Sequence, residues 1–167
     1  MDNAGSNTPI RHIMRTRIVW EHAIKEAEDS PARSWVGAMY SRVKRAAQQR
    51  GIGFEITKDE LLEILRRCGG YCELTGIPLQ DRKPEGARTN WFAPSLDRID
   101  SSAPYRADNC RIVCVAMNVA LGDWGESIFR LLAEGYCCKA GKLKESVSRK
   151  ITDDVIVMCA GGSRKRP

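Results

Sequence analysis

The sequence predicts an α+β fold in which a short β-hairpin and the helix after it form the core, with further helices on both sides. Apolar residues recur with the spacing of a helix face between residues 36 and 47, and again between 61 and 65. Two short runs bounded by loops, SLDRI at 95–99 and CRIVC at 110–114, predict two strands, and the chain turns helical directly after the second.

The composition favours a globular protein with a polyanionic partner. Apolar residues make up 43% of the chain, which is ordinary for a protein with a buried core. The formal net charge is +6, which favours a nucleic acid as the partner. Ordinary basic surfaces carry a similar charge, so the charge alone does not decide between the two interpretations.

Other features predict a cytoplasmic protein that does not enter a membrane. No stretch approaches the roughly 20 apolar residues that a membrane-spanning helix needs. The N-terminus lacks an apolar signal segment, so we do not expect secretion. The seven cysteines are an odd number, which indicates reduced thiols in a cytoplasm.

The N-terminal part divides into a disordered lead over residues 1–15 and a helical, basic region over residues 16–70. Within this region we expect a first helix over 16–28 and a second helix with one buried stripe. The stripe consists of Val36, Met39, Tyr40, Val43 and Ala47.

The second helix carries an exposed face that is purely basic, because no acidic residue occurs between Asp29 and Glu55. We expect Arg42, Lys44 and Arg45 on this face to contact the phosphates of DNA. The alternative is a basic face that is only solvated.

A third helix is expected to begin at a capping box, because Thr57 is followed three residues later by Glu60. Gly69 and Gly70 end this helix. Its buried residues are expected to be Leu61, Leu62, Ile64 and Leu65.

Residues 71–138 are expected to hold the hairpin core and a later helix that starts near Glu126. The beginning of this region, 71–79, is rich in turn residues and predicts a knuckle. The later helix is expected to bury Ile128, Leu131 and Leu132. Residues 139–167 form a basic C-terminal extension, in which 155–158 is a candidate edge strand.

Two polar residues of the core predict a metal site. Asp97 lies on the first strand and Asn118 lies near the start of the helix after the second strand. A hairpin that packs on a helix can bring such side chains together. Carboxylate and amide oxygens are hard ligands that suit Mg²⁺ or Mn²⁺ with several waters and a substrate phosphate.

The order CELTG, SLDRID and NCRIVCVAMN resembles the HNH endonuclease superfamily with its ββα-metal core. The resemblance covers about residues 40–135. It is closest to a phage and bacterial type that lacks the family histidine, and more distant from HNH Holliday-junction resolvases. It implies a metal-dependent DNA endonuclease in a bacterium or phage-infected cell. It also implies that Asp97 and Asn118 bind the metal, that Asn109 braces the loop between the strands, and that Asp100 is the acidic residue of the motif.

The position of the family's catalytic histidine is occupied by Arg98. Arginine stays protonated, so it cannot act as an ordinary general base. Arg98 could bind the scissile phosphate, or it could pair with Asp100 or another carboxylate. The candidate bases are Asp100, Tyr105, or a water activated without any side-chain base.

The family's two CxxC pairs are each reduced to one cysteine, since Thr75 and Met117 stand where the second cysteines would be. Two thiolates do not make the closed four-ligand site of structural zinc. We therefore expect apolar packing in place of a zinc ion. A zinc site, if it formed, would draw on Cys68, Cys72, Cys110 and Cys114.

Two further functions stay open beside the endonuclease. One is a catalytically silent HNH fold that acts as a DNA-binding module, which Arg98 in place of the histidine favours. The other is a small zinc-dependent interaction domain. The sequence leaves the oligomeric state open, including a homodimer.

Overall fold

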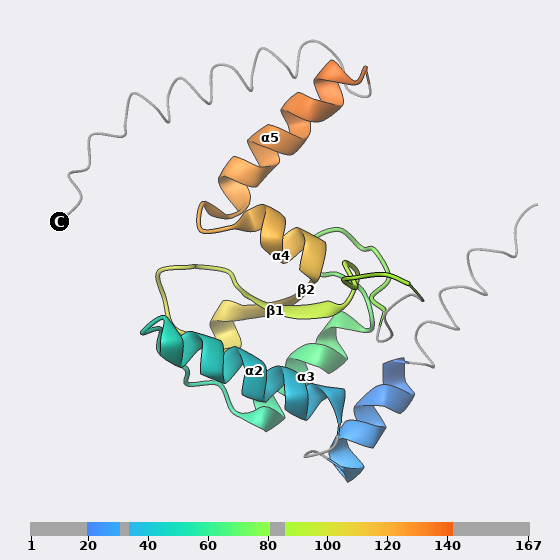
Figure 1. The fold of residues 1–167 in the computed structure, drawn as a ribbon, viewed down its shortest axis with the longest axis vertical. Coiled ribbons are helices and arrows are strands. Elements are labelled where there is room, and N and C mark those ends of the chain that lie inside the picture. Colours follow the sequence, from blue (N-terminus) through green and yellow to red (C-terminus); the bar gives the residue numbers. More distant parts are fainter. Residues whose placement is uncertain (1–19, 31–33, 81–85, 142–167) are drawn as a thin grey trace, which may run out of the picture. The chain divides into compact units, whose positions relative to one another are not determined.

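The computed structural model of the protein describes residues 20–30, 34–80 and 86–141, and it combines helices with a small sheet (Figure 1). This mixed content agrees with the predicted α+β class. A first helix covers residues 20–29. The later elements are α2 (Trp35–Gln49), α3 (Lys58–Cys68), β1 (Pro94–Arg98), the 3-10 turn η1 (Ala107–Asn109), β2 (Cys110–Cys114), α4 (Val115–Leu121) and α5 (Gly125–Lys139). Within the described residues, contacts divide the chain into two units, one that ends at Val119 and one that begins at Ala120.

The helix α2 begins at Ser34, whose hydroxyl accepts a hydrogen bond from the backbone N–H of Gly37. This capping contact satisfies one of the N–H groups that the first turn leaves without a helical partner. Of the predicted stripe, Val36, Met39 and Ala47 are buried, whereas the other two residues are half-buried. The stripe therefore exists, and its centre faces the core.

The helix α3 follows the sequence prediction closely. Thr57 and Glu60 form the capping box, and Gly69 ends the helix in the left-handed conformation with φ at 58°. Its buried residues are Leu61, Leu62, Ile64, Leu65 and Cys68. The first helix packs beside it, because the indole N–H of Trp20 donates to the Leu65 carbonyl at 2.8 Å.

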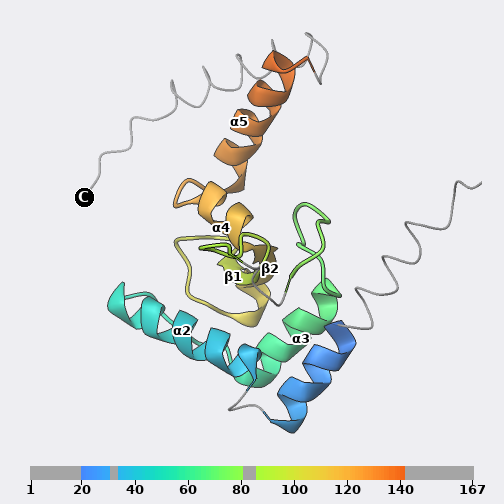
Figure 2. The same cartoon turned by 45° about the vertical axis from the view of Figure 1, so that its right-hand side comes forward.

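The strands β1 and β2 form an antiparallel hairpin with Leu96 opposite Ile112 and Asp97 opposite Arg111. Successive side chains of a strand point to opposite faces, so these two pairs lie on different faces of the hairpin. Leu96 and Ile112 are buried, and α3 packs against β2. Two views show α2 and α3 on one side of the hairpin and α4 on the other (Figure 1, Figure 2).

The helix α5 belongs to the second unit and differs from the prediction. Leu131 is buried, Ile128 is half-buried, and Leu132 is 61% exposed, so the predicted burial of Leu132 is wrong. Helical spacing indicates which side chains share a face, but not whether another element covers all of it.

Some predictions lie outside the described residues, namely the lead over 1–15, residues 16–19 of the first helix, and the candidate strand 155–158. No helix in the described part of the chain is long and apolar enough to cross a membrane.

The capping box offers a test of this part of the fold. Thr57→Ala is expected to destabilise the protein by about 1 kcal/mol, because the first turn of α3 loses a side-chain acceptor. Urea unfolding measures this change. Thr57→Ser keeps the hydroxyl and should stay close to the wild-type stability. Equal losses in both variants would contradict the capping role.

Candidate functional site

Asp97 lies on β1 in a buried ion pair with Arg111 on β2. The Arg111 Nε donates to Asp97 Oδ2 at 2.8 Å, and each residue is only 9% exposed. Burial raises the pKa of the Asp97 carboxyl, and the hydrogen bond and charge of Arg111 oppose that rise. Removing one partner of such a pair costs about 3–5 kcal/mol, because the other charge stays buried alone. The pair therefore fixes the position of the Asp97 carboxylate beside Arg111.

The helix α4 begins directly at the end of β2. The first two N–H groups of α4 donate hydrogen bonds to carbonyls of the segment that precedes and enters β1. The Val115 N–H donates to the Ala93 carbonyl and the Ala116 N–H to the Trp91 carbonyl, each at 2.9 Å. These two bonds satisfy N–H groups that have no partner within the helix. They tie the start of α4 to the entrance of β1.

Asn118 reaches from α4 to the same strand that carries Asp97. Its Nδ2 donates to the Ser95 hydroxyl at 2.8 Å and to the Leu96 carbonyl at 3.3 Å. Ser95 and Asp97 are two residues apart on β1, so their side chains share one face. The structure thus gathers Asp97, Arg111 and Asn118 on the face of the hairpin on which α4 lies.

We call the place where Asp97 of β1, Arg111 of β2 and Asn118 of α4 meet the Asp97 corner. The oxygen donors of Asp97 and Asn118 at this corner are of the kind that binds a divalent cation such as Mg²⁺ or Mn²⁺. Asp97 offers a carboxylate, and Asn118 offers its amide oxygen. The amide nitrogen of Asn118 already donates to β1. Two protein donors leave the remaining positions to waters and a phosphate, which is common for Mg²⁺. Within the described residues no group of three or more His, Cys, Asp or Glu side chains could hold a metal.

Asn109 braces the loop between the two strands. Its Nδ2 donates to the carbonyls of Asp100 and Pro104, at 3.1 and 3.0 Å, and its Oδ1 accepts from the Asp100 N–H at 2.9 Å. The Asp100 carboxylate accepts hydrogen bonds from both the N–H and the hydroxyl of Ser102, which lower the pKa of that carboxyl. The Asp100 carboxylate therefore stabilises the local turn that leads to Ser102.

Arg98 follows Asp97 on β1 and so points to the opposite face. Its Nη1 donates to the Ala103 carbonyl at 2.7 Å, and its guanidinium lies 5.1 Å from the centre of the Tyr105 ring. Tyr105 is buried, and its hydroxyl accepts from Arg50 at 3.2 Å. Arg98 and Tyr105 thus have contacts within the loop and with Arg50, the C-cap of α2, and the structure does not bring them to the face of Asp97.

The four cysteines considered for zinc are buried free thiols. Burial raises the pKa of Cys68 to about 11 and that of Cys110 to about 12. Burial also raises the pKa of Cys114, and the neighbouring Cys72 thiol adds to this. For Cys72, burial acts in the same direction, but hydrogen bonds from Thr75 and backbone N–H groups outweigh it and lower the pKa. Met117 is buried as well. The absence of structural zinc from these four cysteines stays a prediction.

The basic face of α2 is exposed at Arg42, Lys44 and Arg45. None of them forms an ion pair with another residue in the described ranges. In both views α2 and α4 lie on opposite sides of the hairpin (Figure 1, Figure 2).

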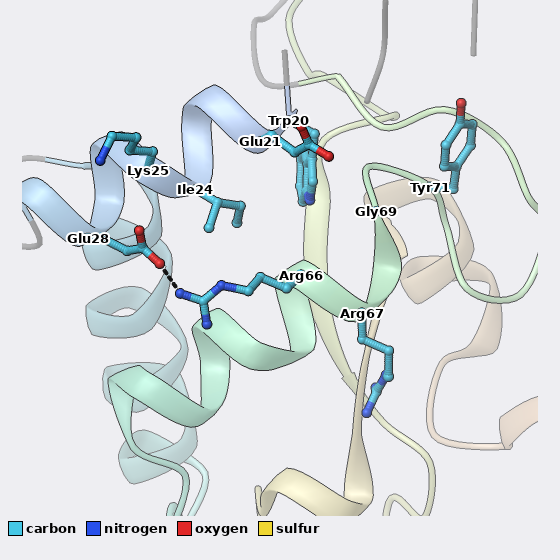
Figure 3. A pocket seen from close by; sticks show the side chains of 9 residues that line it. All are labelled: Trp20, Glu21, Ile24, Lys25, Glu28, Arg66, Arg67, Gly69 and Tyr71. Carbon is cyan, nitrogen blue, oxygen red and sulfur yellow. Dashed lines mark hydrogen bonds and ion pairs between the residues drawn. The ribbon is translucent and has the colours of Figure 1, made fainter. Parts of the chain in front are cut away.

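A pocket of about 640 Å³ lies between the first helix and α3 (Figure 3). Arg66 in this pocket pairs with Glu28, and Arg67 pairs with Glu73 outside it. Trp20 forms an apolar part of its wall. None of the predicted site residues lines this pocket, and its arginines already have partners.

Arg111 is the residue that the sequence interpretation missed. The sequence predicts both strands correctly but leaves their register open, and only the register sets Arg111 opposite Asp97. The available signal was the alternation of CRIVC, which assigns Arg111 and Val113 to one face and the two cysteines to the other.

Comparisons with protein-family models, curated proteins and solved structures found no match to this chain.

The loop contacts of Arg98 predict a structural effect. Arg98→Lys is expected to lower the free energy of unfolding by about 1 kcal/mol, since lysine lacks the planar fork that serves both the carbonyl and the ring. DNA affinity at fixed salt should stay unchanged. Urea unfolding and fluorescence anisotropy with a labelled duplex measure the two quantities.

The matched control is Arg106→Lys, at an exposed arginine that pairs with exposed Asp108. This variant should have the free energy of unfolding and the DNA affinity of the wild type. If Arg98→Lys weakens DNA binding while stability is unchanged, Arg98 contacts phosphate and the structural assignment is wrong.

Proposed function

We propose that this protein is an HNH-like, ββα-metal endonuclease that hydrolyses DNA phosphodiester bonds with Mg²⁺ or Mn²⁺. The observation that carries the proposal is the hydrogen bonding of Asn118 on α4 to the backbone and hydroxyl of β1 beside Asp97. This contact supports a two-donor cation site at the junction of hairpin and helix. The net charge of +6 supports DNA as the partner.

In this proposal each residue of the corner has one task. Asp97 and Asn118 would hold the cation, which would polarise the phosphate and stabilise the leaving oxygen. Arg111 supplies a planar guanidinium that suits a phosphate oxygen pair. Asn109 keeps the loop after β1 in place through its three hydrogen bonds.

Water would attack without a histidine base. The chain contains two histidines, His12 and His22, and both precede the hairpin in sequence. Asp100 and Tyr105 are engaged in turn and loop contacts. Of the three bases considered, these contacts favour water activated without a side-chain base. The proposed setting is the cytoplasm of a bacterium or phage-infected cell, in which the free thiols stay reduced.

A second candidate function is a silent fold that binds DNA without cleaving it. The buried Asp97–Arg111 pair favours this alternative, because the carboxylate that should attract a cation already has a cationic partner. The two functions differ in one property, the cation-dependent breakage of DNA.

The first test is nicking of supercoiled plasmid. Purified protein should nick it with Mg²⁺ or Mn²⁺ and stop when a chelator is added. Asp97→Asn, which keeps the shape of the side chain but removes the ligand charge, should reduce the rate at least about 100-fold. Asp108→Asn, at an exposed carboxylate, is the control and should remain active.

A folded wild-type protein that is inert with every divalent cation and DNA form, yet still binds DNA, would establish the silent fold in place of the nuclease.

The second test concerns α2. Replacing Arg42 and Arg45 by Gln should weaken DNA binding equally for unrelated sequences. It should also flatten the plot of log affinity against log salt by roughly one unit per lost phosphate contact. Fluorescence anisotropy at several salt concentrations measures the slope. An unchanged slope would mean that the basic face is only solvated.

A further inference from the structure

The pair of Asp97 and Arg111 has a consequence for how cations reach this corner. The two residues are directly opposite in the hairpin register, and their side chains are 2.8 Å apart at the hydrogen-bonding atoms. Each side chain is only 11% exposed, so little water screens the pair. In the free protein the negative charge of Asp97 is already balanced.

A divalent cation at Asp97 would lie beside the guanidinium of Arg111. Like charges repel strongly where water is scarce, so this approach is unfavourable while no phosphate lies beside the guanidinium. The amide oxygen of Asn118 carries no net charge and cannot offset the repulsion. The three side chains together therefore form a poor cation site when no phosphate is bound.

A phosphodiester changes this balance. It brings a negative charge and an oxygen pair that a guanidinium binds in a bidentate manner. Arg111 could then share its donors between Asp97 and the phosphate, and the phosphate oxygens would also complete the coordination of the cation. Phosphate and cation thus each reduce the cost of binding the other.

We propose that Arg111 makes the binding of a divalent cation at Asp97 and Asn118 conditional on a bound phosphodiester. This inference rests on the proposed nuclease function and assigns its site a form of regulation. The free protein binds Mg²⁺ or Mn²⁺ weakly, and DNA and the cation enter the site together. By linkage, DNA raises the cation affinity by the same factor by which the cation raises the DNA affinity.

The experiment measures Mn²⁺ binding by electron paramagnetic resonance, with and without a duplex whose phosphorothioate linkages resist hydrolysis. Mn²⁺ bound by the duplex alone, and by the duplex with the Asp97→Asn protein, is subtracted. The wild-type protein should bind Mn²⁺ about tenfold more tightly when the duplex is present, a coupling of ordinary size.

The decisive variant is Arg111→Gln, which keeps a hydrogen-bond donor toward Asp97 and removes the positive charge. It should bind Mn²⁺ more tightly than the wild type without DNA, and the duplex should change its affinity by less than about threefold. Arg106→Gln removes an exposed arginine that pairs with Asp108, and it should behave as the wild type does. The thermal unfolding of each variant is recorded first.

Two results would overturn the inference and leave the nuclease proposal intact. One is tight binding of Mn²⁺ by the wild-type protein without DNA, which needs no variant to be folded. The other is the same dependence on DNA in Arg111→Gln as in the wild type. If neither the wild type nor Arg111→Gln binds Mn²⁺ at Asp97, with or without the duplex, the proposed cation site itself is wrong. The nuclease proposal and this inference then fail together.

Discussion

The cross-strand pair of Asp97 and Arg111 determines the geometry of the candidate site. Two opposite charges, each 9% exposed, face one another across the two strands of the hairpin. Burying such a pair adds little net stability, but removing one of the two charged side chains is strongly destabilising. The pair therefore constrains the positions of both side chains more than it stabilises the fold. It fixes the carboxylate that the proposed chemistry needs, and it brings a guanidinium to the same place.

The hairpin separates two environments. On one face Leu96 and Ile112 are buried, and α3 packs against β2. On the other face α4 carries Asn118, which hydrogen-bonds to the backbone of β1. Alternation along a strand assigns neighbouring residues to these two environments. The adjacent residues Asp97 and Arg98 therefore have unrelated partners, one across the strands and one within the loop.

Much of this arrangement could be predicted from the sequence, because local chemistry determines it. The capping box at Thr57 and the strand Cys110–Cys114 appear where they were expected. The register of the hairpin could not be predicted, since a shift of one residue would move every side chain to the other face. Arg98 was expected at the site because it occupies the position of the family's histidine, whereas the register sets Arg111 opposite Asp97. The burial of Leu132 was predicted wrongly because the covering of a helix face depends on elements far from it in the chain.

We propose that Asp97, Asn118 and Arg111 form one site for a cation and a phosphate. The most direct measurement is a crystal structure of the protein with Mn²⁺ and a phosphorothioate duplex, in which the anomalous signal locates the manganese. We expect manganese bound to the Asp97 carboxylate and the Asn118 amide oxygen, with Arg111 hydrogen-bonded to the phosphate that shares the ion. Manganese located elsewhere, with Arg111 still paired to Asp97 and no phosphate near it, would mean that these three residues do not form such a site.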